Sequence, residues 1–286
     1  EAVSNERRRH LLLQLRSGSK QVRRRLLSRL LVVWAGQLIS GLGTGMTGFA
    51  LGVHVFNRTG SAAGFGLVVA ALFVPSILLR PVGGVLADRL DRRLLIAAGD
   101  LGSAAAVLFL LLSLTGGGLT LPRIYIGVAM SSAFSTLQGP AYKASVSDLL
   151  GSEHFARAGG MMQLASAAQH LLSPMAAGLL LATAGLEAIL IIDVATFAFS
   201  VAAVLALRAA FAGGNASVAC SCSRGGRRPI AALAELRDGV AALKADRRVT
   251  ETVLLLSVVT FFVGLLQTLF APMMLSFTDA KTLGVV

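Results

Sequence analysis

The chain has 286 residues, of which 55% are hydrophobic and 14% are charged, and its mean hydropathy is +0.75. Soluble domains carry about 25% charged residues, so this composition excludes an ordinary soluble domain. A formal net charge of +12 would suggest nucleic-acid binding in a soluble protein. Here the basic residues instead follow a membrane topology, and we expect no nucleic-acid partner.

Apolar runs recur along the chain, and a helix that spans a bilayer needs about 20 apolar residues. They predict seven transmembrane helices, at Leu30–Val55, Ala63–Leu86, Leu94–Leu114, Arg123–Gln138, Ala158–Thr183, Ala188–Leu207 and Thr250–Leu275. The fold class is therefore an all-α membrane protein. We expect a basic cytoplasmic tail over 1–29, a six-helix bundle over 30–208, a cytoplasmic linker with an amphipathic helix over 209–249, and a seventh membrane helix over 250–286.

Arginine and lysine lie mainly before the first run and in alternate turns. The turn after the second run holds Arg89, Arg92 and Arg93, whereas the opposite side keeps Arg58, Arg123 and Lys281. This is the asymmetry of the positive-inside rule. It predicts a multi-pass protein with a cytoplasmic amino terminus, whose basic tail contacts anionic membrane lipids.

Two of the predicted connections contain apolar residues. The loop Lys143–Arg157 carries Val146, Leu149 and Leu150 among polar residues, which predicts a short helix in the membrane interface. In the linker, Pro229 opens an amphipathic stretch that favours a surface helix.

Six residues of the second turn, Gly84, Leu86, Asp88, Arg89, Arg92 and Arg93, match a Gly-x-Leu-x-Asp-Arg-x-Gly-Arg-Arg motif, with Asp91 at the second glycine position. This motif is a hallmark of the major facilitator superfamily, which the chain resembles. Residues 34–43, 192–197 and, loosely, 173–178 resemble the branch of the enterobactin exporter and macrolide efflux proteins. The resemblance implies a six-helix bundle followed by the first helix of a second bundle. Since the family has twelve helices, we expect the rest of the carboxy-terminal bundle to be missing from this chain.

The resemblance also implies a function. It implies a secondary active transporter of the bacterial cytoplasmic membrane that expels an amphipathic small molecule (a drug, macrolide or siderophore) in exchange for protons, by alternating access. Gly84, Asp88, Arg89, Arg92 and Arg93 would form a conformational latch between the two bundles. No nucleotide-binding loop is present, so we expect no direct ATP coupling. The histidines are scattered outside any Asp/Glu/His cluster, so we expect no enzyme activity, and we also expect no cofactor and no metal. A non-transporting membrane sensor or scaffold that retains a truncated transporter fold remains an alternative.

Three charged residues fall within the predicted helices: Arg80, Asp100 and Asp193. Charges inside a membrane mark functional candidates by default. Arg80 and Asp100 are equally distant from Leu90 on antiparallel helices, so they could pair. Alternatively, Arg80 reaches the inner interface while Asp100 bonds a neighbouring helix, and both interpretations stay open. For Asp193 we expect a structural hydrogen bond rather than proton transfer.

Polar side chains within the helices are candidates for a substrate cavity, although each could equally pack between helices. They are Gln37, Thr44, Gln138, Gln163 and Gln169. Thr44 stands where many members of the branch have an acid. Pro174 and Gly178 are candidates for a hinge, because proline frees a backbone carbonyl and bends a helix. The glycine-rich first helix favours close helix packing.

Overall fold

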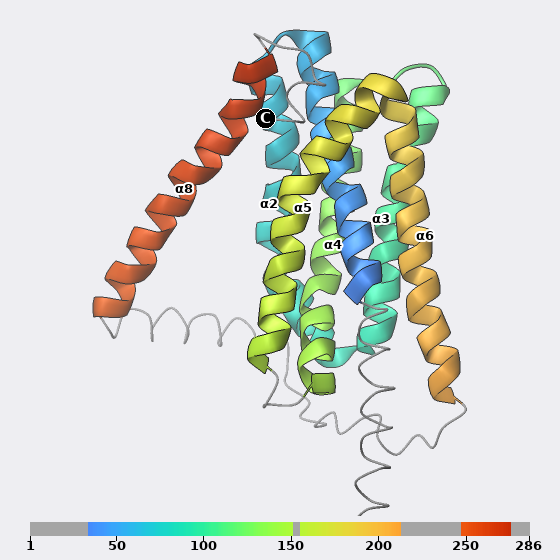
Figure 1. The fold of residues 1–286 in the computed structure, drawn as a ribbon, viewed down its shortest axis with the longest axis vertical. Coiled ribbons are helices and arrows are strands. Elements are labelled where there is room, and N and C mark those ends of the chain that lie inside the picture. The colour runs from blue at the N-terminus through green and yellow to red at the C-terminus, as the bar shows by residue number, and fades with distance from the viewer. Residues whose placement is uncertain (1–33, 151–154, 213–246, 276–286) are drawn as a thin grey trace, which may run out of the picture.

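The structure is a computed structural model that describes residues 34–150, 155–212 and 247–275, and these segments are helical apart from short turns (Figure 1). Each of the seven helices in them overlaps one of the predicted runs, so the all-α membrane fold is confirmed. The helices are the first helix Trp34–Thr59, α2 Ala62–Arg89, α3 Arg92–Thr115, α4 Leu121–Leu150, α5 Phe155–Thr183, α6 Gly185–Ala212 and α8 Arg247–Leu275.

Two helices extend past the ends that the sequence predicts. The short interfacial helix expected from Lys143 does not begin there, because residues 143–150 continue α4 without a break. No glycine or proline lies between Pro140 and Leu150, and Gly151 follows, so nothing in the sequence stops the helix earlier. Similarly, α6 extends to Ala212, into the expected linker. The basic tail, the amphipathic part of the linker and the last residues lie outside the described residues.

Short turns make successive helices antiparallel neighbours. Gly60 has a φ of 62°, a left-handed conformation that glycine adopts without strain. Ser61 then caps α2, since its Oγ accepts a hydrogen bond of 3.3 Å from the backbone N–H of Gly64. Gly185, with a φ of 79°, joins α5 to α6 almost directly.

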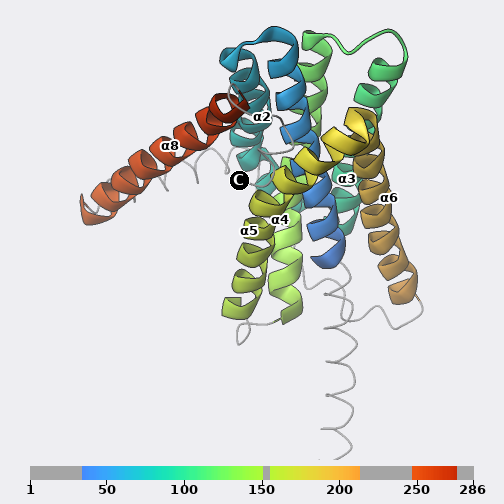
Figure 2. The same cartoon turned by 45° about the horizontal axis from the view of Figure 1, so that its top comes forward.

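The apolar core lies where the first helix meets α2, α3, α4 and α6. Leu51, Val68, Leu110, Val128 and Phe197 are all buried in one cluster there. Around it, α4 packs against both α2 and α3, and α3 packs against α6. The first helix, blue in Figure 1, runs inside the bundle and is bordered by α2, α5 and α6 (Figures 1 and 2).

The glycines of the first helix form three seams with three different helices. A Cβ added to any of them would meet atoms of a neighbouring helix within 4 Å. The pairs are Gly36 and Gly43 against α6, Gly41 and Gly45 against α5, and Gly48 and Gly52 against α2. The glycine spacing therefore lets three neighbours approach one helix closely, as small residues do in membrane bundles.

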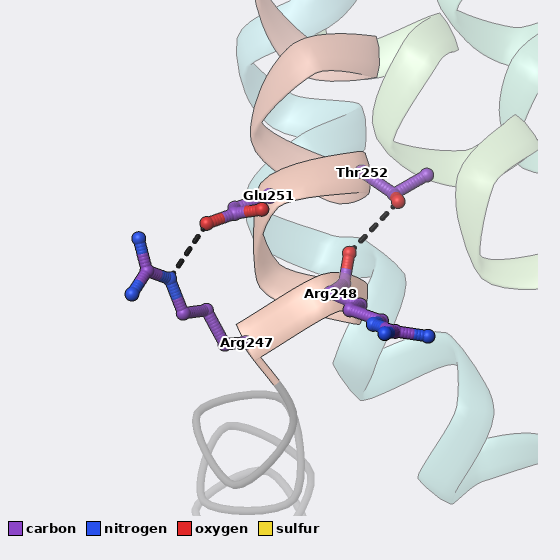
Figure 3. A network of polar contacts seen from close by, with 4 residues as sticks. All are labelled: Arg247, Arg248, Glu251 and Thr252. Atoms are coloured by element: carbon purple, nitrogen blue, oxygen red, sulfur yellow. Dashed lines mark hydrogen bonds and ion pairs between the residues drawn. The ribbon is translucent and has the colours of Figure 1, made fainter.

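The last described helix, α8, leans away from the bundle and packs against α2 (Figures 1 and 2). Its apolar surface, which includes Leu254, Leu266 and Phe261, is exposed, as suits contact with lipid or with further helices. At its amino-terminal end, Arg247 Nε lies 2.7 Å from Glu251 Oε1, and Thr252 Oγ1 donates a 2.8 Å bond to the carbonyl of Arg248 (Figure 3).

Six of the described helices are long and apolar enough to span a membrane, and α4 is the one that is less apolar. Its polar residues bond neighbouring helices. Ser132 Oγ donates to the carbonyl of Leu72 in α2, and Ser103 Oγ of α3 donates to the carbonyl of Ser131 at 3.2 Å. These bonds tie α4 to α2 and α3 inside the bundle, and the chain is a multi-pass membrane protein.

Candidate functional site

Asp100 is the centre of a hydrogen-bonded network that joins three helices. Its side chain is fully buried, and its Oδ2 accepts bonds from Ser200 Oγ of α6 at 2.6 Å and from Gln37 Nε2 of the first helix at 3.1 Å. Gln37 Nε2 also donates to Ser200 Oγ at 3.0 Å. We call Gln37, Asp100 and Ser200 the Asp100 network. It ties the first helix, α3 and α6 together inside an apolar bundle.

Gln138 of α4 adds a fourth helix to this site. Its side chain is buried and lies beside the carboxyl group of Asp100. In the orientation assigned, Gln138 Oε1 and Asp100 Oδ1 both lack a hydrogen-bond partner. Amide orientation is a matter of assignment, and turning the amide would present an N–H donor to Asp100. The structure therefore brings Gln37 and Gln138, two of the five cavity candidates, to the same carboxylate.

Asp193 lies on the seam between α6 and the first helix. It is fully buried, and a Cβ on Gly43 would lie 2.6 Å from its Oδ1. Thr47 and Thr196 face the carboxyl group, but neither carboxylate oxygen has a hydrogen-bond partner of normal geometry. Thr196 Oγ1 donates to the Asp193 backbone carbonyl at 2.7 Å, whereas Thr47 Oγ1 has no other partner, and the structural hydrogen bond expected for Asp193 stays a prediction.

The predicted pair of Arg80 and Asp100 is not formed either. The Arg80 side chain is exposed on α2, and no ion pair joins the two residues in the described part of the chain. The physical reason is that Asp100 faces α6 and the first helix rather than α2. The alternative that the sequence left open, in which Asp100 bonds a neighbouring helix, agrees with this geometry.

The remaining cavity candidates do not converge on Asp100. Thr44 Oγ1 donates within its own helix, to the carbonyl of Ser40 at 3.1 Å. Gln169 of α5 lies across Gly41 in the seam with the first helix. Gln163 is exposed on α5. These three side chains are thus distributed over packing seams and surface rather than gathered around one cavity.

The two hinge candidates lie within a continuous helix, since α5 stays helical through Pro174. Gly178 is buried one turn later. Immediately before the proline, Ser173 Oγ donates a 3.1 Å bond to the carbonyl of Leu42. The proline therefore lies where α5 is anchored to the first helix, and its role as a hinge stays a proposal.

The latch turn is as short as the sequence indicates. Helix α2 ends at Arg89, α3 begins at Arg92, and Leu90 is extended with a backbone N–H bond of 2.9 Å to the carbonyl of Leu86. A Cβ on Gly84 would meet nothing within 4 Å, and Arg89 is exposed. The side chains of Asp88, Arg92 and Arg93 lie outside the described residues, so the contacts of the latch stay a prediction.

Sequence reasoning missed Ser200 and Thr47. A signal for Ser200 was present, because Asp193, Thr196 and Ser200 are spaced by three, four and seven residues, which places them on one face of a helix. Gly36 and Gly43 have the same seven-residue spacing on the first helix. Trp34 was also missed as a contact: its Nε1 donates to the carbonyl of Met161 at 3.3 Å and ties the first helix to α5.

Comparison with known proteins shows the family of the chain. Macrolide efflux protein A of Streptococcus pyogenes is 29% identical over 162 residues, which are 57% of this chain and 40% of that protein. Enterobactin exporter EntS of Shigella flexneri is 35% identical over 159 residues, covering 54% of this chain and 37% of the exporter. The matches thus cover about two fifths of the relatives' length. The sequence also matches the family described as Major Facilitator Superfamily over residues 33–285. The chain belongs to the major facilitator superfamily.

Proposed function

We propose that this protein is a secondary active transporter that expels an amphipathic small molecule from a bacterial cell, in exchange for protons. The observation that carries the proposal is the buried polar site inside an otherwise apolar bundle, with Gln37, Gln138 and Ser200 around the Asp100 carboxylate. Polar groups at this depth are costly and mark substrate or ion pathways.

The substrate class is supported by the relatives rather than by a pocket. One relative is named for macrolides and the other for enterobactin, which are chemically different molecules. A drug, macrolide or siderophore therefore fits better than a single metabolite. Alternating access, with the bundle rocking about a midplane site, is the mechanism that suits such a fold.

We place the protein in the bacterial cytoplasmic membrane with its amino terminus in the cytoplasm. The basic residues support this orientation, since they concentrate before the first helix and in alternate turns. In this orientation the α2–α3 turn faces the cytoplasm. Gly84, Asp88, Arg89, Arg92 and Arg93 would then act as the latch that holds one conformation of the transport cycle, and Pro174 with Gly178 would be the hinge in α5.

The experiment is accumulation of radiolabelled erythromycin, as a macrolide probe, in an efflux-deficient bacterial strain that expresses the complete reading frame. Expression should lower accumulation, and a protonophore should restore it. The variant Asp88→Asn should lose most of this effect, whereas Asp91→Asn, at the position that departs from the motif, should retain it. Unchanged accumulation of several chemically different probes would favour a sensor or scaffold without transport.

A further inference from the structure

Two arginines bond to one turn at the end of the bundle opposite the α2–α3 turn. Arg58, in the last turn of the first helix, donates from Nη1 to the carbonyl of Leu119 at 2.7 Å. Arg123, in the first turn of α4, donates from Nη1 to the carbonyl of Gly118 at 3.2 Å. The two acceptors are neighbours in the turn between α3 and α4, which lies at the upper end of the bundle in Figure 1.

An open pocket of about 320 Å³ lies at this turn. Its lining comes from the end of the first helix, including Arg58, and from residues 117–121. Small-ligand pockets have volumes of about 300–1,000 Å³, so the space suits a small polar group. We propose that this pocket binds the phosphate group of an anionic phospholipid, and that Arg58 and Arg123 hold it. We call it the arginine pocket.

The turn that carries the two carbonyls has a fixed shape. Gly117 and Gly118 have φ values of 135° and 104°, in the left-handed region that glycine adopts at little cost. The next residue, Leu119, is buried in the apolar core of the bundle. The fold therefore holds the arginine pocket in place, and a pocket that is already formed costs less conformational entropy when it binds a ligand.

The positive charge of the arginine pocket is not balanced by an acid. Neither Arg58 nor Arg123 forms an ion pair in the part of the chain that the structure describes. Among the described residues, the acid at this end of the bundle is Glu187 of α6, which is exposed and bonds neither arginine. An arginine has five N–H donors, so donors remain beyond the one that each spends on the turn. Guanidinium groups match the oxygens of a phosphate in charge and geometry.

The position of the arginine pocket favours a lipid over a soluble anion. It lies where the first helix ends at Thr59 and α4 begins at Leu121, and the ends of spanning helices lie at the level of the lipid headgroups. From the same turn, Arg123, Ile126 and Met130 follow one face of α4, since they are three and four residues apart. Ile126 and Met130 are both exposed, so an apolar surface continues from the arginine into the membrane.

A second exposed apolar row descends from the turn along α3. Leu112, Leu108 and Leu101 are four and seven residues apart, which places them on one face, and all three are exposed. In a membrane these two rows face acyl chains. A phospholipid whose chains lie along either row presents its phosphate at the arginine pocket, whereas a soluble phosphate would contact neither row.

This inference goes beyond the proposed function and does not depend on transport. In the orientation proposed above, the arginine pocket lies in the outer leaflet. It is therefore separate from the lipid contacts that the sequence predicts for the basic tail, which lie on the cytoplasmic side.

The first test is native mass spectrometry of the full chain, purified in detergent and titrated with phosphatidylglycerol. The wild type should retain one phosphatidylglycerol more tightly than any further copy. Arg58→Gln combined with Arg123→Gln should weaken its retention by about tenfold or more, because charge-assisted hydrogen bonds are lost. Lys143→Gln combined with Arg247→Gln removes the same charge at exposed positions toward the other end of the bundle, and should leave retention unchanged. Equal weakening by both pairs, or no tightly held lipid in the wild type, would overturn the proposal.

Thr120 allows a second test that leaves both arginines and their carbonyl partners in place. It is exposed and lines the arginine pocket. Thr120→Glu adds a carboxylate that repels phosphate and pairs with the arginines, whereas Thr120→Gln has nearly the same shape without the charge. Retention of phosphatidylglycerol should fall in Thr120→Glu and persist in Thr120→Gln. Equal retention by these two variants would contradict the proposal even if the double arginine variant does not fold.

Two further probes identify what the arginine pocket binds. Phosphatidylglycerol should bind more tightly than phosphatidylcholine, in which a quaternary ammonium offsets the phosphate charge. It should also bind more tightly than glycerol 3-phosphate, which has no acyl chains. Equal binding of phosphatidylcholine would mean that apolar contact rather than the two arginines holds the lipid, and equal binding of glycerol 3-phosphate would assign the pocket to a soluble anion. Either result would overturn the proposal.

Discussion

Gly43 of the first helix lies opposite Asp193 of α6, and Gly36 lies opposite Ser200 seven residues along. The two contacts run in opposite directions along the two chains, so the helices are antiparallel and in one register. Each glycine allows a polar residue of α6 to press against the backbone of the first helix. The contact between the first helix and α6 therefore contains Asp193 beside Gly43 and, seven residues along α6, Ser200 of the Asp100 network beside Gly36.

Gly43→Ala should destabilise the bundle. The new methyl group would lie 2.6 Å from both Asp193 Oδ1 and Thr196 Oγ1 and 3.3 Å from the Asp193 backbone, so the helices must move apart. Overpacking of this kind costs about 1–3 kcal/mol. Thermal unfolding in nanodiscs should show a clear fall in the midpoint temperature.

The control for this change is Gly66→Ala on α2, where a Cβ would meet nothing within 4 Å. Alanine is a better helix former than glycine by about 1 kcal/mol, so Gly66→Ala should leave stability unchanged or raise it slightly. Equal midpoints for Gly43→Ala and Gly66→Ala would show that the seam is looser than the structure has it.

Gln37→Leu and Ser200→Ala should be strongly non-additive. Both residues donate to the same oxygen of Asp100, and Gln37 also donates to Ser200. Residues that share one network show coupling energies of about 0.5–3 kcal/mol, which a double-mutant cycle of unfolding free energies measures. As a reference, Gln37→Leu combined with Ser173→Ala, in the seam with α5, should be additive.

The sequence was sufficient for the helices and for the family, because both depend on strong local signals. Seven apolar runs and a charge-dense turn at Leu90–Asp91 each predict structure within a few residues. The predicted helix ends were less accurate where the sequence has no helix-breaking residue. No glycine or proline ends α4 near Lys143, and no such residue precedes Ala212 at the end of α6.

The site was predictable only in part, because which residues face each other depends on helix rotation. Arg80 and Asp100 are equally far from the turn in sequence, which predicts a similar depth in the membrane. The depth of a residue does not determine which neighbouring helix its side chain faces. Asp100 turns toward α6, and Arg80 turns outward. Asp193 and Ser200 are seven residues apart, and so are Gly36 and Gly43. These equal spacings indicate which faces of α6 and the first helix pack together, and the contact between the two helices could have been predicted from them.

Arg80 and Asp100 should behave as independent residues. Arg80 is exposed on α2 and Asp100 is buried against other helices. The effects of Arg80→Ala and Asp100→Asn on unfolding free energy should therefore add to within about 0.5 kcal/mol. Rescue of one charge reversal by the other, in Arg80→Asp with Asp100→Arg, would instead establish a pair in some other conformation of the cycle.

Breaking the ion pair at the start of α8 should change stability very little. Arg247 and Glu251 bond at 2.7 Å, but their side chains are 92% and 62% exposed, so water competes for both charges. Pairs of this kind at the i and i+4 positions contribute about 0.3–0.5 kcal/mol. The order of the two residues is also the weaker one, since the acid is better placed before the base on a helix.

Glu251→Gln should thus leave the unfolding midpoint within error of the wild type at both low and high salt. A helix amino terminus attracts negative charge, so Arg247 at the first position of α8 opposes the helix dipole, and Arg247→Gln should be neutral or slightly stabilising. A loss above about 1 kcal/mol in either variant exceeds what an exposed pair can supply. It would mean that the amino-terminal end of α8 contacts another element, although Arg247 and Glu251 are exposed in the structure.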